Sequence, residues 1–140
     1  MRKALAVISG LFLALTIFAC AGKQKKILLT EQSQVKLRNM QSRVFDTTNQ
    51  NLMLRTVIAT LQDLGFVIDD ADEILGTVSA TKLKGYVLRM TVSVRPRGDK
   101  QMIVRSNAQY NLQTVEEPEP YQQFFAALSK ALFLEAQQIE

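Results

Sequence analysis

The side chains that serve most often as general bases and zinc ligands are nearly absent from this chain. Its 140 residues include no histidine and a single cysteine, Cys20. Histidine-based acid–base catalysis and metal sites built from several His and Cys residues are therefore excluded. Ser129 and Lys130 are adjacent, and adjacent side chains on a helix diverge by about 100°, which is wrong for a hydrogen-bonded nucleophile and base. We predict no catalytic residues, no metal site and no cofactor, and hence a protein that is not an enzyme.

Two groups of charged residues are candidates for binding. Asp69–Glu73 has the oxygen ligands that calcium prefers, but it lacks the alternating acidic spacing and central glycine of an EF-hand loop, which favours a solvated turn. Arg89, Arg95 and Arg105 fall at polar positions of two predicted strands. They could dock an acidic partner or a lipid phosphate, and the alternative is an ordinary solvated surface.

The N-terminus has the composition of an export signal. Arg2 and Lys3 precede an uncharged, mostly apolar run from Ala4 to Phe18. This run is shorter than the ~20 residues that a helix needs to cross a bilayer. We therefore predict a signal peptide over residues 1–19, although a retained membrane anchor is an alternative.

The end of this leader, Leu15–Cys20, resembles the lipobox of bacterial lipoproteins. Ile17, Ala19 and Cys20 match the pattern of an aliphatic residue, a variable residue, a small residue and cysteine, while Phe18 is bulkier than usual. The resemblance implies cleavage between Ala19 and Cys20 and acylation of Cys20, so no thiol remains for catalysis. Because Ala21 is not aspartate, it also implies sorting to the outer membrane, facing the periplasm. Cleavage by ordinary signal peptidase at Ala19 would instead give a secreted protein.

The rest of the chain is long enough for one domain. Without Arg2 and Lys3, 15 basic residues face 13 acidic ones, so net charge gives no support for nucleic-acid binding. Residues 20–34 are rich in Gln, Lys and Ser, and we interpret them as the lipidated cysteine and a flexible tether. Residues 35–140 are predicted to form a single domain.

Hydrophobic periodicity gives the order of elements in this domain. Val35–Phe45 is interpreted as a strand with a bulge. A helix should follow the capping residues Asp46–Asn49 and end at Gly65. Short strands are expected at Phe66–Ile68 and Thr77–Leu83, with an acidic turn between them and another turn at Gly85.

Two longer strands alternate apolar even-numbered residues with polar odd-numbered ones, from Tyr86 to Val94 and from Met102 to Leu112. Because both apolar sets are even-numbered, Val94 should lie opposite Val104 and Val92 opposite Ser106, with a three-residue loop from Gly98 to Lys100. A last helix should begin near Pro120. Its apolar stripe comprises Tyr121, Phe124, Phe125, Leu128, Leu132 and Ile139.

The predicted fold is α+β: an antiparallel sheet of about five strands with two helices packed on one face, in the order β-α-β-β-β-β-α. Phe125 and Leu128 should be buried against Val92 and Val104. In its leader, its tether and this element order, the chain resembles the helix-grip modules of the small lipoprotein of the outer-membrane β-barrel assembly machinery, which is larger and carries two such modules.

The expected function is that of a non-catalytic, membrane-anchored lipoprotein that binds another envelope protein through the polar face of the sheet. Arg89, Arg95 and Arg105 would supply the contacts. The alternative is a carrier that holds an amphiphile between the last helix and the sheet. Its motivation is the pair Phe133 and Leu134, which fall off the apolar stripe.

Overall fold

The computed structural model describes residues 34–83 and 87–138. The chain divides into two units, Met1–Lys36 and Leu37–Glu140. The predicted signal peptide, Cys20, the tether up to residue 33 and the turn at Gly85 lie outside the described residues. Within the described ranges, no helix is long and apolar enough to cross a membrane.

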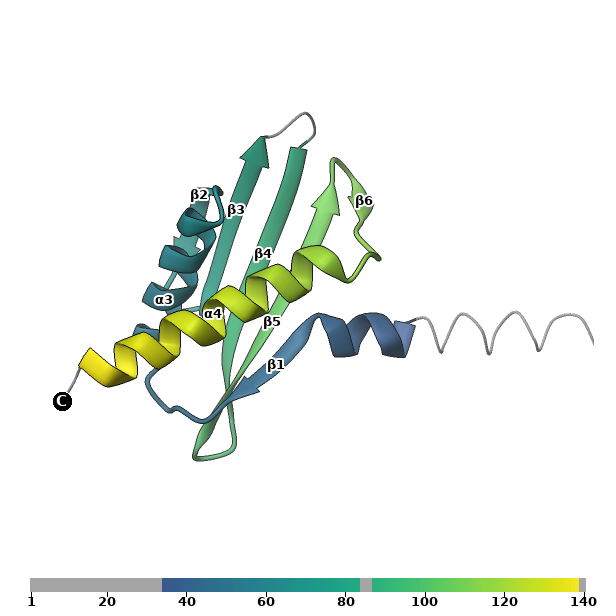
Figure 1. Ribbon diagram of the computed structural model, residues 1–140. Coiled ribbons are helices and arrows are strands. Elements are labelled where there is room, and N and C mark those ends of the chain that lie inside the picture. Colours follow the sequence, from purple (N-terminus) through teal and green to yellow (C-terminus); the bar gives the residue numbers. More distant parts are fainter. Residues whose placement is uncertain (1–33, 84–86, 139–140) are drawn as a thin grey trace, which may run out of the picture. The chain divides into compact units, whose positions relative to one another are not determined.

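The second unit is built on a six-stranded antiparallel sheet in the order β1-β5-β4-β3-β2, with β6 also paired to β5 (Figure 1). Strands β2 to β5 are consecutive in sequence and adjacent in space, whereas β1 lies at the far edge beside β5. The strands are β1 (Ser42–Phe45), β2 (Val67–Asp72), β3 (Thr77–Leu83), β4 (Val87–Arg97), β5 (Gln101–Tyr110) and β6 (Gln113–Thr114).

Helices α3 (Gln50–Asp63) and α4 (Glu119–Gln138) pack on one face of the sheet (Figure 1). Asn49 caps α3, because its side-chain oxygen accepts a hydrogen bond from the Leu52 N–H at 2.9 Å. The helix ends where Gly65 takes a positive φ of 83° and its N–H donates to the Gln62 carbonyl. The predicted limits of this helix are confirmed, as is the α+β fold.

The core lies between the helices and the even-numbered strand residues. Phe125, Leu128, Val92 and Val104 are all buried in one apolar cluster, as predicted. Val94 lies opposite Val104 and Val92 opposite Ser106, which confirms the predicted register. The loop between β4 and β5 has the predicted three residues.

The first predicted strand is wrong over most of its length. Residues 34–40 are helical, and only Ser42–Phe45 forms a strand. Leu37 and Met40 pack partly buried against the core. Their spacing of three residues puts both on one side of a helix. The apolar pattern that resembled an irregular strand therefore comes from about two helical turns followed by a short strand.

Two other boundaries differ from the prediction. Asp69–Asp72, expected to be a turn, belongs to β2, which is irregular between Ile68 and Asp70. An edge strand is paired on one side only, so it tolerates exposed carboxylates. Strand β5 ends at Tyr110 rather than Leu112, because Asn111 takes a positive φ of 54° and reverses the chain, which leaves Leu112 exposed.

Candidate functional site

The three arginines named from the sequence all lie on the open face of the sheet, the face opposite the helices. Arg89 and Arg95 lie on β4 and Arg105 on β5, and all three side chains are exposed. They alternate along their strands with the buried even-numbered residues, so they point away from the core. Their predicted exposure on this face is confirmed.

The strand register brings two of these arginines together and leaves the third apart. Arg105 lies opposite Ser93, and Arg95 lies opposite Ile103. Arg95 and Arg105 are therefore diagonal neighbours, about 7–8 Å apart at their Cα atoms. Arg89 lies four residues before Ser93, the residue opposite Arg105, so it is roughly 13 Å from that pair along the strand.

A fourth arginine extends this basic patch. Arg97 is exposed, two residues beyond Arg95 on the same strand. We define the basic patch as Arg95, Arg97 and Arg105. Arg97 was not among the arginines named from the sequence, although its odd number assigns it to the polar set of β4. Arg105 is oriented by its Nε, which donates to the Ser42 hydroxyl at 3.3 Å.

The surface around the basic patch is mainly polar, apart from the half-buried Ile103, which lies opposite Arg95. Thr91, Ser93, Asn107 and Gln109 occupy the odd-numbered positions between the arginines. At the other side of the sheet, Asp70 and Asp72 of β2 lie opposite Ser79 and Thr77, so they share the open face. The open face therefore runs from acidic at β2 to basic at β4 and β5.

Neither edge of the sheet is suited to adding a further strand. At one edge β2 is interrupted between Ile68 and Asp70 and carries Asp69, Asp70 and Asp72. At the other edge β1 has four residues and β6 has two. Bulges, charges and short strands are the usual protection against edge pairing. A protein partner would therefore meet the open face rather than an edge.

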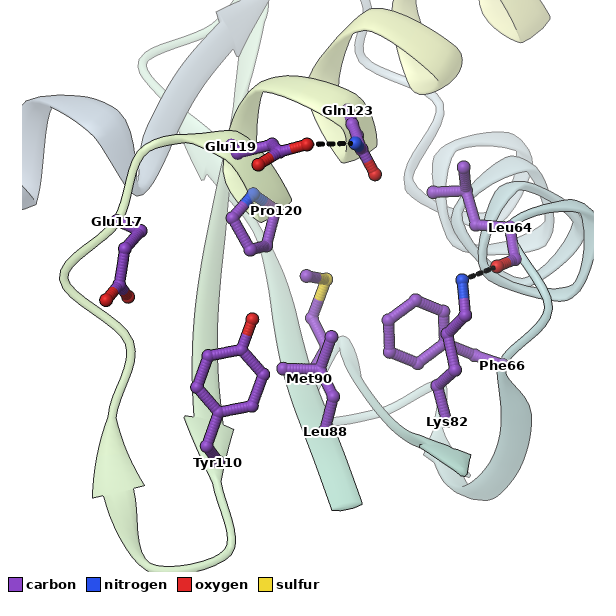
Figure 2. Close-up of a pocket in the computed structure, with 10 residues that line it drawn as sticks. All are labelled: Leu64, Phe66, Lys82, Leu88, Met90, Tyr110, Glu117, Glu119, Pro120 and Gln123. Atoms are coloured by element: carbon purple, nitrogen blue, oxygen red, sulfur yellow. Dashed lines mark hydrogen bonds between the residues drawn. The ribbon is translucent and has the colours of Figure 1, made fainter. Parts of the chain in front are cut away.

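A cavity of about 400 Å³ lies beside the first turn of α4 (Figure 2). Its apolar floor consists of Phe66, Leu88 and Met90, none of them more than 7% exposed. Leu64 and Pro120 add to the walls. Its lining residues come from segments up to 59 positions apart, so no local pattern could indicate which side chains meet there.

The rim of the cavity carries both signs of charge. Lys82 lies at one side and Glu117 at the opposite side, with Leu88 and Met90 between them (Figure 2). The Lys82 Nζ donates to the Leu64 carbonyl at 2.7 Å and lies 5.6 Å from the centre of the Phe66 ring. The Glu119 carboxylate accepts a hydrogen bond from the Gln123 amide at 3.1 Å.

Phe133 and Leu134, which motivated the carrier alternative, do not line this cavity. They lie in the second half of α4, with exposed fractions of 61% and 49%. The cavity instead lies at the beginning of that helix. The idea of a space between the last helix and the sheet therefore agrees with the geometry, while the residues cited for it do not.

Tyr121 connects the start of α4 to the edge of the sheet through its hydroxyl. Sequence reasoning did not predict these hydrogen bonds. The side chain is fully buried. Its hydroxyl donates to the Val115 carbonyl at 2.8 Å and accepts from the Gln41 amide and the Ala108 N–H, each at 3.3 Å. A tyrosine on the apolar stripe of a helix is ordinarily interpreted as a core residue, so no sequence signal indicated the hydrogen bonds of its hydroxyl.

Other chemistry has little support in the described residues. Among residues 34–83 and 87–138, no group of three or more His, Cys, Asp or Glu side chains is arranged to hold a metal ion. The Ser129 hydroxyl donates to the Phe125 carbonyl at 2.8 Å within its own helix. No protein-family model matches the chain, and no curated protein matches it.

Proposed function

We propose that this protein is a non-catalytic lipoprotein, anchored through Cys20 to the periplasmic face of the outer membrane, whose open sheet face binds another envelope protein. The lipobox resemblance at Ile17, Ala19 and Cys20 supports the anchor. An acylated cysteine holds a protein on a membrane through its buried CH₂ groups, at ~0.8 kcal/mol each. The polar segment up to residue 34 would give the domain reach.

The observation that carries the protein-binding role is the arrangement of the sheet. One face is covered by α3 and α4, both edges are protected, and the remaining face presents exposed Arg95, Arg97 and Arg105 among short polar side chains. Arginine is enriched at protein interfaces because its planar guanidinium forms paired hydrogen bonds with carboxylates. The favoured partner surface is therefore flat and acidic.

Electrostatic contacts of this kind act mainly on the rate of association and on specificity. Exposed charges are screened within about 8 Å at physiological ionic strength, so binding through the basic patch should weaken as salt is raised. The salt dependence of binding thus distinguishes a partner bound by the basic patch from one bound by the exposed apolar residues of α4.

The test is site-specific photocrosslinking in intact cells. A photoreactive residue at Asn107, two residues beyond Arg105 on the open face, should capture one envelope protein, whereas the same residue at Ala126, exposed on α4, should not. Replacing Arg95 and Arg105 by glutamate should reduce capture to background. Lys130→Glu, which reverses an exposed charge on α4, is the matched control and should leave capture unchanged. Equal capture from both positions, or capture that survives the double reversal, would contradict the proposal.

A further inference from the structure

The cavity beside α4 has the features of a small-molecule site that is separate from the open face. Its walls come from the end of α3, from β3, β4 and β5, and from the start of α4 (Figure 2). Sites for small ligands typically enclose 300–1,000 Å³, with an apolar lining and a few polar groups that orient the ligand. At about 400 Å³, this cavity has room for about 13 non-hydrogen atoms at ~30 Å³ each.

The floor suits a hydrocarbon chain. Phe66, Leu88 and Met90 belong to the apolar core and form the base of the cavity. The half-buried Leu64, Tyr110 and Pro120 around them present more surface to a chain. Methionine is unbranched and flexible, so a floor that contains Met90 can adapt to a chain that lies on it. Each CH₂ that leaves water for such a surface contributes about 0.8 kcal/mol.

The polar group best placed to select a head group is Lys82. Its ammonium carries three N–H donors, and the contact with the Leu64 carbonyl uses one of them. The contact is partly buried, which strengthens interactions with the ammonium compared with those of an exposed charge. Glu117 is exposed, and Glu119 is exposed and hydrogen-bonded to Gln123, so both carboxylates are better screened.

We infer that this cavity binds a single-chain amphiphile of about ten carbons, with its chain on Phe66, Leu88 and Met90 and an anionic carboxylate or phosphate head at Lys82. The inference does not rest on the proposed protein-binding function, because Arg95, Arg97 and Arg105 lie on the opposite face of the sheet.

The test uses the full chain in phospholipid vesicles and a photoreactive diazirine analogue of decanoic acid, followed by mass spectrometry of the labelled peptides. Labelling should map to the peptides that contain Leu88 and Met90 and should be displaced by unlabelled decanoate or decyl phosphate. The stronger competitor identifies the head group. Labelling spread along the chain, or equally strong displacement by decyltrimethylammonium, would overturn the inference.

Two variant pairs make the result specific. Gln122 and Gln123 are adjacent and exposed on α4, but only Gln123 lines the cavity. Gln123→Trp should therefore block labelling and Gln122→Trp should not. Lys82→Met keeps the apolar stem and removes the ammonium, so decanoate should lose its advantage over decanol as a competitor by about tenfold, the size of a hydrogen bond to a charged group. Lys82→Arg should retain that advantage. An unchanged ratio in Lys82→Met, with circular dichroism matching the parent, would refute the role of Lys82.

Discussion

Gly76 and Gly98 form a natural matched pair for testing how tightly the β2–β3 turn packs. Both have positive φ, 64° and 63° respectively. A Cβ at Gly76 would lie 2.5 Å from the Val94 carbonyl oxygen and 2.8 Å from the Gln50 amide nitrogen, whereas at Gly98 nothing lies within 4 Å. Gly76 also accepts a hydrogen bond from the Val94 N–H at 2.8 Å.

The two alanine variants should therefore differ in a predictable way. In Gly98→Ala the cost is the left-handed backbone alone, about 1–2 kcal/mol. Gly76→Ala adds overlap with the backbone of β4, at about 1–3 kcal/mol, and strain on the Val94 hydrogen bond, at about 1 kcal/mol. We expect Gly76→Ala to lower the free energy of unfolding by about 3–6 kcal/mol, which is about 2–4 kcal/mol more than Gly98→Ala.

Urea unfolding followed by far-ultraviolet circular dichroism measures this difference, with both variants in a Cys20→Ser background so that acylation does not vary. The slope with urea should be shared by the two proteins, so that the midpoint reports stability. Equal midpoints for Gly76→Ala and Gly98→Ala would show that the turn does not approach β4 closely, and would refute the reasoning.

Four further predictions concern the anchor and the core. Radiolabelled palmitate should be incorporated into the parent chain and not into Cys20→Ser; equal labelling of both, or of neither, would contradict acylation at Cys20. Phe125→Ala should cost about 3–5 kcal/mol from lost burial and the cavity left behind, and a thermal melt unchanged within about two degrees would place Phe125 outside the core, since 1 kcal/mol moves the midpoint of a domain this size by several degrees. Tyr121→Phe should lower the free energy of unfolding by about 1–3 kcal/mol, because the buried groups that bond to its hydroxyl lose their partner. A urea midpoint equal to the parent's would refute this prediction. Thr60 and Ser106 are buried with hydroxyls that have no hydrogen-bond partner, so Thr60→Val and Ser106→Ala should each raise stability by about 1 kcal/mol; a fall in stability would argue that an ordered water satisfies them.

The sequence was sufficient to predict a structural feature wherever a residue pattern was compatible with only one arrangement of the backbone. In β4 and β5 the even-numbered apolar residues could face the helices only in registers in which paired numbers sum to an even value, and Val94 with Val104 is such a pair. The limits of α3 followed from Asn49 and Gly65, whose backbone roles are local. The strand register and the helix limits depend on a few neighbouring residues, so the folded protein has them as the sequence predicts.

Features that depend on distant partners were not predictable in the same way. Leu37 and Met40 suit either a helix or an irregular strand, and their packing against the core decides between them. The cavity is formed by side chains from several segments, so no local pattern marks it. For the open face, the exposure of Arg89, Arg95 and Arg105 was predictable, but the separation of Arg89 from the other two required the register.

The Tyr121 hydroxyl joins the last helix to the edge of the sheet, which has a consequence for shortened chains. The outer edge of β5 is completed from both ends of the second unit: the Gln41 carbonyl accepts the Ser106 N–H, and Tyr121 of α4 accepts the Ala108 N–H. Strand β5 ends at Tyr110 and α4 begins at Glu119, so only eight residues separate the strand from the helix that completes its edge. In a chain without α4, the Ala108 N–H would lose the Tyr121 hydroxyl and the apolar face of the sheet would lack its second helix. A chain truncated before α4 would therefore expose apolar surface of the kind on which chaperones act.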